Sequence, residues 1–566
     1  MKIKDQLIQK LDLIIDDLNV EDISLMLEIP PNSELGDYAF PCFKLAKTYR
    51  KAPKVIADEI AGKLKDDELI ERIEVVGAYI NIFVNKVNFI SNVYNEFCKK
   101  DKNYGESNYG EGKTVVIDYS SPNIAKSFHI GHLRTTVIGS SLYKIHKCLG
   151  YNTVGVNHLG DWGTQFGKLI VAYKKWGVKE EIESIGISEL NRIYVKFHEE
   201  AEKDETLNEE ARNWFTEMEK GNEEALELWS WFKEISMKEF NRVYELLGIQ
   251  FDSFNGESFY NDKMQDVINE LEDKQLLELS EGARIVDLSD NDMPPCLITK
   301  KDGSSLYATR DISAAIYRKK TYDFEKNIYV TAIAQNLHFS QWFKVIEKMG
   351  YDWHDKLTHV SFGMVSMNNG KLSTRKGNVI LLEDLLRESI EKTKEIIEAK
   401  NPNLANKEEV AKQIGIGAII FNDLFNNRIK DVVFSWENIL NFDGETGPYI
   451  QYTNARACSL LKKGNYESLN KNINFDLVKD EYSMAIFKLI ENFPIKIREA
   501  ADKLEPSLLT RYIVEVAKAF NKFYNENPIL VEDEDVKNAR LSIVYAVSAI
   551  ITKGLSLLGI DAPNQM

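Results

Sequence analysis

Cysteine is scarce in this chain of 566 residues, and glycine and proline are sparse. It has five cysteines, 31 glycines and 13 prolines. The cysteines stand singly, at Cys42, Cys98, Cys148, Cys296 and Cys458. No close pair predicts a zinc site or a disulfide framework, and the pattern fits a reducing cytoplasm. The low glycine and proline content excludes a fibrous or largely disordered protein. We therefore expect a folded cytoplasmic protein with no structural metal.

Long apolar runs and an excess of basic charge are also missing. Residues 1–6 alternate charged and apolar side chains, and no later stretch has the length needed to cross a bilayer. We therefore expect no secretion signal and no membrane span. Lys and Arg number 71 against 88 Asp and Glu, a net charge of -17. Indiscriminate binding to polyanions is disfavoured, because phosphate affinity comes from Lys and Arg. RNA bound through local basic and aromatic patches stays compatible with this charge.

The length predicts several domains, because single cores stop growing at about 250–300 residues. The first segment combines helical periodicity from Leu7 to Leu18 with a strand-like run at 78–84. The predicted segments are a small α/β domain at 1–108, an α/β domain at 109–383 with a helical insertion at about 176–250, a helical stem at 384–443 and an all-helical bundle at 444–566. From 384 onward the pattern is almost wholly helical.

A strand, a helix and a strand open the central domain. The β-branched run 114–119 predicts a buried parallel strand, and 151–157 predicts a second one. Between them, apolar residues recur at steps of three and four, and Gly150 follows as a natural helix cap. The runs 327–330 and 358–362 predict later strands of the same sheet. This order predicts a doubly wound, Rossmann-type α/β domain.

Residues 120–132 lead from the first predicted strand through a polar turn into a helix. Such a helix start favours bound phosphate, because backbone N–H groups and the helix dipole point toward it. His129 and His132 stand three residues apart, so both can donate to one triphosphate, and Gly131 would let a base approach the backbone. Two surface histidines beside a helix cap would be the alternative without further context.

His-Ile-Gly-His at 129–132 resembles the signature of class I, Rossmann-type aminoacyl-tRNA synthetases. The preceding Ser-Ser-Pro-Asn-Ile-Ala-Lys, at 120–126, is similar to the arginine-specific branch of that family, as is the block 157–167 after the second strand. The resemblance implies ATP binding around this turn, with His129, His132 and Lys126 as catalytic residues. It implies further ATP contacts from Gly131, His158, Gly160, Asp161 and Gln165.

A basic, glycine-flanked segment at 370–378 resembles the Lys-Met-Ser-Lys loop of the family. The resemblance implies that Lys371 and Ser373 meet the phosphates, and that Met364 and Val365 belong to the stretch whose backbone reads adenine. Thr374 departs from the family pattern, because it occupies the place of the second lysine. In the arginine branch the lysine before the signature, here Lys126, is thought to substitute. The local competitors for this role are Arg375 and Lys376, and the sequence leaves the choice open.

A pocket selective for arginine needs carboxylates placed for paired hydrogen bonds to a planar guanidinium. The segment 306–315 is similar to the family segment that supplies them. The resemblance assigns arginine binding to Asp118, Ser121, Asn123, Tyr307, Asp311 and Gln335. Taken alone, Asp311 would be a helix cap or the partner of Arg310 or Arg318. Lysine and citrulline would leave buried acids under-paired, so no editing domain is expected.

Both ends of the chain resemble tRNA-binding parts of the family. Tyr449 and Tyr452 lie three apart in a segment similar to the start of the helical anticodon-binding domain, and could stack on unpaired bases. Met566 matches the family's C-terminus, and Tyr79 and Asn81 match the N-terminal domain that touches the outer corner of tRNA. Tyrosines at helical spacing are also common in protein cores, so a packing role is the alternative.

The resemblance implies ATP-dependent attachment of L-arginine to tRNA(Arg) through arginyl-adenylate, with release of AMP and pyrophosphate. Mg2+ would accompany ATP, and the expected enzyme is a cytoplasmic monomer. The alternatives are a tRNA-independent nucleotidyltransferase or amino-acid ligase of the same superfamily and a catalytically silent tRNA-binding paralogue. The helical segment 444–566 argues against the first, and the intact His129, His132, Tyr307 and Asp311 argue against the second.

Overall fold

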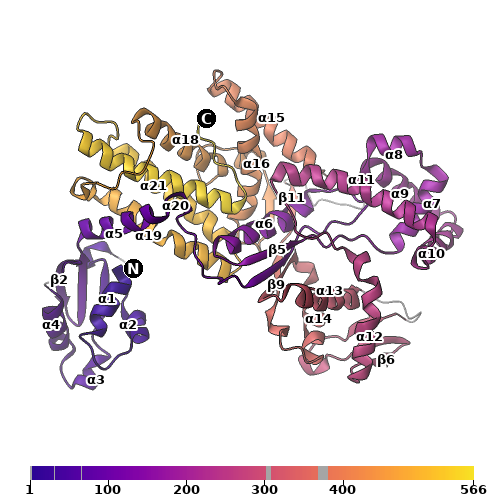
Figure 1. Ribbon diagram of the computed structural model, residues 1–566, viewed down its shortest axis with the longest axis horizontal. Coiled ribbons are helices and arrows are strands. Elements are labelled where there is room, and N and C mark those ends of the chain that lie inside the picture. Colours follow the sequence, from indigo (N-terminus) through magenta and orange to yellow (C-terminus); the bar gives the residue numbers. More distant parts are fainter. Residues whose placement is uncertain (1–2, 31, 66, 301–306, 368–379) are drawn as a thin grey trace. The chain divides into compact units, whose positions relative to one another are not determined.

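A computed structural model describes residues 3–30, 32–65, 67–300, 307–367 and 380–566 (Figure 1). By contacts between Cα atoms the chain divides into two compact units. The first comprises 1–104, 456–494 and 515–553, and the second comprises 105–455, 495–514 and 554–566. The C-terminal helices therefore contribute to both units.

A four-stranded parallel sheet forms the centre of the second unit. Its strands are β4 (Thr114–Asp118), β5 (Asn152–Val156), β9 (Lys326–Ala332) and β10 (Leu357–Phe362). Their order is β10-β9-β4-β5, and β4 pairs with β5 on one side and with β9 on the other. The chain thus winds outward from β4 to β5 and then crosses back to β9. This reversal confirms the predicted doubly wound domain.

Helix α6 (Leu133–Cys148) connects β4 to β5, as the sequence predicts. Val116 and Ile117 of β4 are fully buried, and apolar residues of α6 such as Leu142 and Ile145 share the core. The helix ends at Cys148, and Gly150 follows the cap residue Leu149 with a φ of +82°, a left-handed conformation that glycine adopts without strain. The local sequence pattern therefore predicts this βαβ unit correctly.

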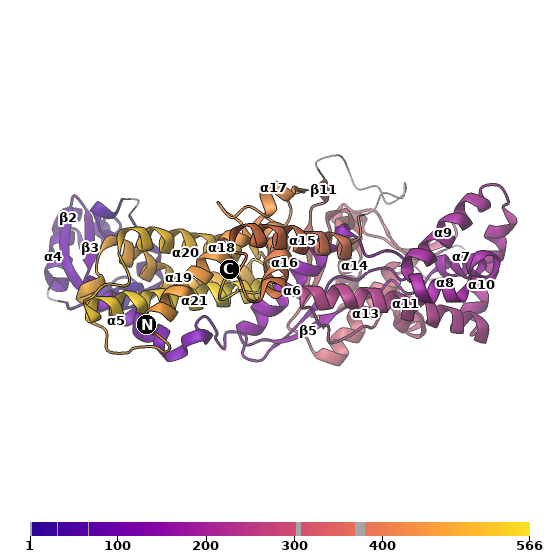
Figure 2. The ribbon, with the colours of Figure 1, turned by 90° about the horizontal axis from the view of Figure 1, so that it is seen from above.

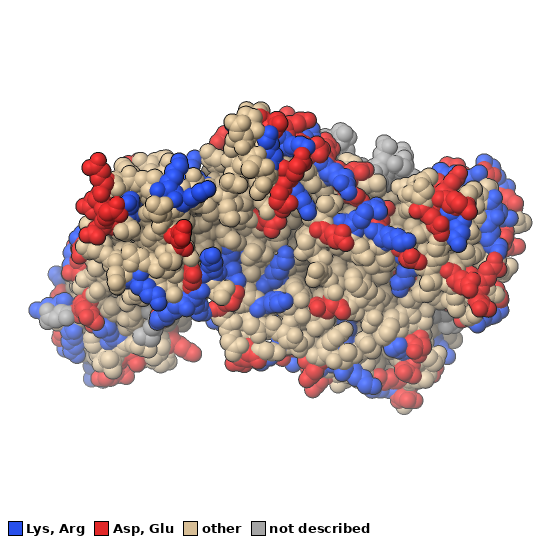
Figure 3. Space-filling view, turned by 45° about the horizontal axis from the view of Figure 1, so that its top comes forward, with Lys and Arg blue, Asp and Glu red and all other residues tan. Residues whose placement is uncertain are grey.

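The predicted helical insertion is a group of helices between β5 and β9 (Figure 2). They are α7 (Thr164–Trp176), α8 (Lys179–Ile185), α9 (Ile187–Ala201), α10 (Thr206–Glu219) and α11 (Glu223–Leu247). Helix α7 already begins at Thr164, so the helices start before the predicted residue 176. Basic and acidic side chains are interspersed over them at the right of Figure 3 and form local ion pairs such as Lys175 with Glu210.

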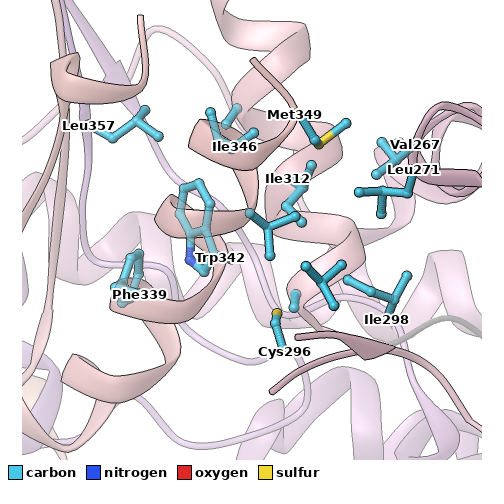
Figure 4. Packing of buried hydrophobic residues seen from close by; sticks show 14 of the residues in the cluster. Val267, Leu271, Cys296, Ile298, Ile312, Phe339, Trp342, Ile346, Met349 and Leu357 are labelled. Carbon is cyan, nitrogen blue, oxygen red and sulfur yellow. The ribbon is translucent and has the colours of Figure 1, made fainter. Parts of the chain in front are cut away.

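A small antiparallel sheet, which the sequence pattern does not predict, follows the insertion. Its strands β6 (Glu278–Ser280), β7 (Ala283–Val286) and β8 (Cys296–Thr299) are too short for a clear alternation. Helices α12 (Met264–Asp273), α13 (Tyr307–Tyr322) and α14 (Asn336–Lys348) pack with this region. Ile298, Ile312 and Trp342 are fully buried in their shared core (Figure 4). This core anchors the start of α13, where the predicted arginine-binding residues lie.

The remainder of the chain is helical, as predicted, apart from one short strand. The helices are α15 (Leu382–Lys400), α16 (Lys407–Phe425), α17 (Trp436–Ile439), α18 (Gly447–Lys463), α19 (Glu481–Asp502), α20 (Ser507–Glu526) and α21 (Glu534–Leu558). The short strand β12 (Val432–Phe434) pairs in parallel with β11 (Val365–Met367). This pairing ties the segment after β10 to the segment after α16.

Helix α21 corrects one expectation from the sequence. It has 25 residues and a mean hydropathy of 1.8 in its most apolar window, long and apolar enough to cross a bilayer. Within that window, 72% of the residues are buried inside the protein. Its apolar character is therefore explained by a core position, which the sequence alone does not distinguish from a membrane span.

The N-terminal part of the first unit is an α/β fold. Three antiparallel strands in the order β1-β3-β2 make its sheet: β1 (Tyr38–Pro41), β2 (Ile70–Val76) and β3 (Tyr79–Val84). The accompanying helices are α1 (Ile3–Asp12), α2 (Val20–Met26), α3 (Leu45–Tyr49), α4 (Pro53–Leu64) and α5 (Lys86–Lys100). The predicted helix through Leu18 is too long, because α1 ends at Asp12 and the side chain of Leu13 is exposed.

Candidate functional site

The predicted substrate-binding residues follow the carboxyl ends of the four parallel strands. Asp118 ends β4, and His158 comes two residues after β5. Gln335 ends the short 3-10 turn after β9, and Met364 comes two residues after β10. All four strands run in one direction, so these residues share one edge of the sheet. The chain reverses its winding between β4 and β9, and ligands of doubly wound proteins bind at such a point.

The signature residues His129–His132 form a 3-10 turn that leads into α6. His129 Nδ1 accepts a hydrogen bond from the Gly131 N–H at 3.0 Å, and His132 Nδ1 accepts one from the His129 N–H at 3.2 Å. In each neutral ring the proton is therefore on Nε2. A Cβ at position 131 would lie 2.7 Å from the His129 ring, so a larger residue here would displace that ring. The two rings lie 4.1 Å apart and can act as neutral donors.

Burial lowers the pKa of His132 from its ordinary 6.5 to about 3, and it also lowers the pKa of His129. Because the unfolded chain binds these protons first as the pH falls, stability should be lost below pH 6.5. The His132 contribution should be on the order of 1–2 kcal/mol at pH 5. We expect the unfolding midpoint in urea to fall more steeply from pH 7 to pH 5 in the wild type than in His132→Asn, whose amide oxygen can still accept the His129 N–H. Equal slopes would contradict a buried neutral His132.

The Asp118 carboxylate is already paired on both oxygens. Arg318 Nη2 lies 2.8 Å from Oδ2, and Ser121 Oγ donates to Oδ1 at 2.8 Å. Arg318 is fully buried and also lies 3.4 Å from His158 Nδ1. Direct guanidinium binding by Asp118 stays a prediction, and Arg318 is a partner of Asp118 that local patterns do not reveal.

Asp311 is the more open carboxylate of the site. Tyr307 and Asp311 lie one turn apart at the start of α13, and the Tyr307 side chain is 65% exposed. Asp311 Oδ2 lies 2.6 Å from His338 Nε2, on α14. The alternative partners weighed for Asp311 are not observed, because Arg310 pairs with Glu257 and Arg318 pairs with Asp118. His338 is thus a second residue that the sequence alone does not identify.

The block after β5 packs directly against the loop after β4. The Gly160 N–H donates to the Pro122 carbonyl at 3.1 Å, and the Asn123 side chain lies where a Cβ of Gly160 would be. Asp161 is fully buried, and its carboxylate accepts hydrogen bonds from Lys233 and from the Ser258 backbone and hydroxyl. These contacts do not favour ATP binding by Asp161, which stays a prediction.

Gln165 and Lys126 line a small hollow beside this loop. Gln165 is the second residue of α7, so the start of the insertion faces the predicted phosphate site. Ser121 and Asn123 lie in the same loop after β4, and Asn123 is exposed. The side chains of Lys126, Gln165 and Asn123 are therefore accessible from solvent or from this hollow.

The segment after β10 is held by backbone contacts. The Met364 N–H donates to Asp431 at 2.7 Å, and its carbonyl accepts from the Val432 N–H at 2.9 Å. Val365 pairs with Val432 in the β11–β12 ladder. These bonds do not favour adenine recognition by the Met364 backbone. Lys371, Ser373, Thr374, Arg375 and Lys376 lie outside the described residues.

The predicted tRNA contacts differ in exposure. Tyr79 is 38% exposed on β3, whereas the side chain of Asn81 is only 5% exposed. Tyr449 and Tyr452 lie in the first turns of α18, and Tyr452 is the more exposed of the two. Met566 packs against the apolar cluster of α15 and α16. Tyr79 and Tyr452 are thus accessible for stacking, and the burial of Asn81 does not favour direct contact.

Three family models match the chain. One described as tRNA synthetases class I (R), catalytic domain, matches residues 93–436. One described as DALR anticodon binding domain matches 450–566, and one described as arginyl tRNA synthetase N terminal domain matches 1–84. These matches together span nearly the whole chain.

Curated relatives and solved structures agree with these matches. The arginine–tRNA ligase of Alkaliphilus metalliredigens is 56% identical over 98% of this chain and 97% of the relative. That of Halothermothrix orenii is 56% identical over 100% and 99%. The arginyl-tRNA synthetase of Thermus thermophilus has the same fold, with a TM-score of 0.80 and 23% identity over 95% of this chain and 96% of that one. The arginyl-tRNA synthetase of Plasmodium falciparum gives a TM-score of 0.78 and 25% identity over 100% and 98%. This chain therefore belongs to the arginyl-tRNA synthetase family of class I.

Proposed function

We propose that this protein attaches L-arginine to tRNA(Arg) in two steps. Arginine's α-carboxylate attacks the α-phosphate of ATP, giving arginyl-adenylate and pyrophosphate. A ribose hydroxyl of the terminal adenosine of tRNA then attacks the adenylate and releases AMP. The observation that carries the proposal is the shared sheet edge. At that edge, the His129–His132 turn comes after β4. The Asp311–His338 pair joins the helices that precede and follow β9.

Adenylate formation requires positioning and charge neutralisation, and no protein nucleophile takes part. His129 and His132 donate from Nε2 to the phosphates, because their Nδ1 atoms are occupied by backbone N–H groups. Lys126 and Lys371 supply positive charge. The remaining ATP contacts are proposed for Gly131, Gly160, Gln165 and Ser373. His158 lies close to Asp118 and Arg318.

Mg2+ accompanies ATP in this proposal. The described residues contain no group of three or more His, Cys, Asp or Glu side chains that could hold a metal ion. A Mg2+ that arrives with ATP is held mainly by phosphates and water, and it needs only one or two protein carboxylates. The metal would neutralise charge on the phosphates.

For arginine, Asp311 is proposed to bind the guanidinium and Tyr307 to fix its plane. The pair with Arg318 neutralises Asp118, so Asp118 contributes to guanidinium binding only if it exchanges this partner for the substrate. Ser121, Asn123 and Gln335 are proposed to hold the α-amino and α-carboxylate groups. Because the Asp311 side chain is 25% exposed whereas Asp118 is buried and paired on both oxygens, we assign the larger part of guanidinium recognition to Asp311.

For tRNA, we propose that 444–566 binds the anticodon and that 1–108 contacts the body of the molecule. Of the tyrosines predicted to bind tRNA, Tyr452 and Tyr79 are exposed and suited to stacking on unpaired bases. The catalytic domain at 109–383, the stem at 384–443, a cytoplasmic location and a monomeric state belong to the same proposal.

Arginine-dependent exchange between ATP and pyrophosphate, measured with and without tRNA, tests the function. Exchange with arginine in either condition, followed by charging of tRNA(Arg), is the expected result. No exchange under either condition would overturn the proposal. Exchange without any charging would instead indicate a tRNA-independent ligase, and exchange with lysine would refute the pocket assignment.

A Lys126→Ala change should slow adenylate formation about 10- to 100-fold, the effect of losing one charged hydrogen bond to a phosphate. Lys126 is exposed, so the unfolding midpoint should not change. The measurement is single-turnover adenylate formation, with the exposed Lys113→Ala as a matched control. Near-normal rates would show that Arg375 or Lys376 carries the role.

A further inference from the structure

The helical insertion ends in α11, and one face of this helix contacts the loops that follow β4 and β5. The residues of this face recur at steps of three and four, which places them on one side of the helix. They are Trp229, Lys233, Ser236, Phe240 and Tyr244. Each contacts a residue of 120–128 or of 157–161.

The loop after β4 has an uncommon backbone conformation. Ser120, Ser121 and Ala125 have φ angles of +71°, +47° and +59°. A left-handed conformation costs roughly 1–2 kcal/mol for a residue other than glycine, and it persists only where the surroundings enforce it. Asn123 lies within this loop and Lys126 directly follows it. The loop conformation therefore determines where both side chains lie.

Tyr244 holds the first half of the loop. Its hydroxyl lies 2.8 Å from Ser120 Oγ and accepts a hydrogen bond from Asn157 Nδ2 at 2.9 Å. Asn157 Oδ1 in turn accepts the Ser121 N–H at 3.2 Å. The phenol is buried, so water cannot readily replace it. One hydroxyl thus connects two of the three left-handed residues.

Ser236 holds the second half. Its fully buried Oγ accepts the Ala125 N–H at 2.9 Å and donates to the Phe232 carbonyl within α11. One turn away, Lys233 pairs with the Asp161 carboxylate and Trp229 donates to the Asp161 carbonyl at 2.7 Å. The helix therefore restrains both loops that flank the substrate site.

We propose that α11 is a positioning element for amino-acid activation, in which Tyr244 and Ser236 hold the 120–125 loop in the left-handed conformation that presents Asn123 and Lys126. This proposal rests on the proposed function. The two residues act through the loop and do not touch the substrates.

Kinetics of arginine-dependent exchange test the proposal. Tyr244→Phe and Ser236→Ala should each lower kcat/KM for arginine about tenfold, with a smaller change in KM for ATP. Tyr351→Phe is the control, because it removes a hydroxyl that bonds Glu270 in the same unit and has no contact with the 120–125 loop in the described structure. Adding Ala125→Gly to Ser236→Ala should restore part of the activity, since glycine adopts this φ without strain. A merely structural role for Ser236 predicts no rescue, and that result would overturn the proposal.

Hydrogen–deuterium exchange separates this proposal from the function itself. In the free enzyme, backbone amides of 119–128 should exchange at least tenfold faster in Tyr244→Phe and Ser236→Ala than in the wild type or Tyr351→Phe. Unchanged protection would overturn the positioning role, even in an active enzyme. A wild type that shows loop protection but no arginine-dependent exchange would refute the proposed function and the role in activation together.

Discussion

Asp311→Asn is expected to lower kcat/KM for arginine about 100- to 1,000-fold while KM for ATP changes less than about twofold. Asparagine keeps the shape of the side chain and an oxygen for His338 Nε2, now 2.6 Å from Asp311 Oδ2. It removes the charge that a guanidinium needs, and losing one partner of a desolvated charge pair costs about 2–5 kcal/mol. The measurement is ATP–pyrophosphate exchange at varied arginine concentration.

The control for this change is Asp323→Asn, just beyond the end of the same helix. Asp323 pairs with Lys319, and its side chain is 90% exposed, so its loss should leave both KM values unchanged. The preference for arginine over citrulline provides a second readout. It should fall in Asp311→Asn, because the neutral amide no longer favours a charged substrate. An unchanged preference for arginine in this variant would move guanidinium recognition to Asp118, despite its pairing with Arg318.

The parts of the fold that are predictable depend on neighbours in sequence. The β-branched residues of β4, the apolar spacing of α6 and the cap at Gly150 are local signals, and all three are confirmed. Short strands such as β6, with three residues, give no comparable alternation. The pattern also predicts that an α-helix starts at His129. The structure instead has a 3-10 turn, in which backbone N–H groups donate to both imidazoles.

The parts of the site that are not predictable depend on partners distant in sequence. Motifs mark Asp118 and Asp161, but no local rule shows that Arg318 or Lys233 already pairs with them. Both partners come from helices that the chain adds between β5 and β9. Residue types at a motif therefore indicate the chemistry, while the long-range contacts decide which side chains stay free for a ligand.

Arg134 also has partners that are distant in sequence, and its replacement should have the largest effect on stability. Its side chain is fully buried two residues after the signature, with Nε 3.0 Å from Asp423 on α16. Nη1 donates to the Gly363 carbonyl at 2.9 Å and to the Lys430 carbonyl at 2.8 Å. Arg134→Met should lower the free energy of unfolding by about 3–5 kcal/mol, because it leaves a buried carboxylate unpaired. Urea unfolding of the full chain measures this loss.

The loss of unfolding free energy in Arg134→Met should also depend on pH. Burial raises the pKa of Asp423, and the charge of Arg134 opposes this effect. Without Arg134 the folded pKa should rise further above the unfolded value. The folded protein then binds the proton more tightly than the unfolded chain, so the destabilisation should grow as the pH rises from 5 to 8. A loss that is constant over this range would indicate that Asp423 keeps its charge or finds another partner.

A double variant separates the ion pair from the carbonyl contacts. Arg134→Met with Asp423→Leu removes both charges, and replacing a buried pair by apolar side chains is often nearly neutral. Here the Gly363 and Lys430 carbonyls would still lose their donor, so recovery should be partial and the remaining loss should no longer depend on pH. Full recovery would mean that the carbonyl contacts contribute little. No recovery would mean that Arg134 acts mainly by holding the segment after β10, and adenylate formation should then stay slow in the double variant.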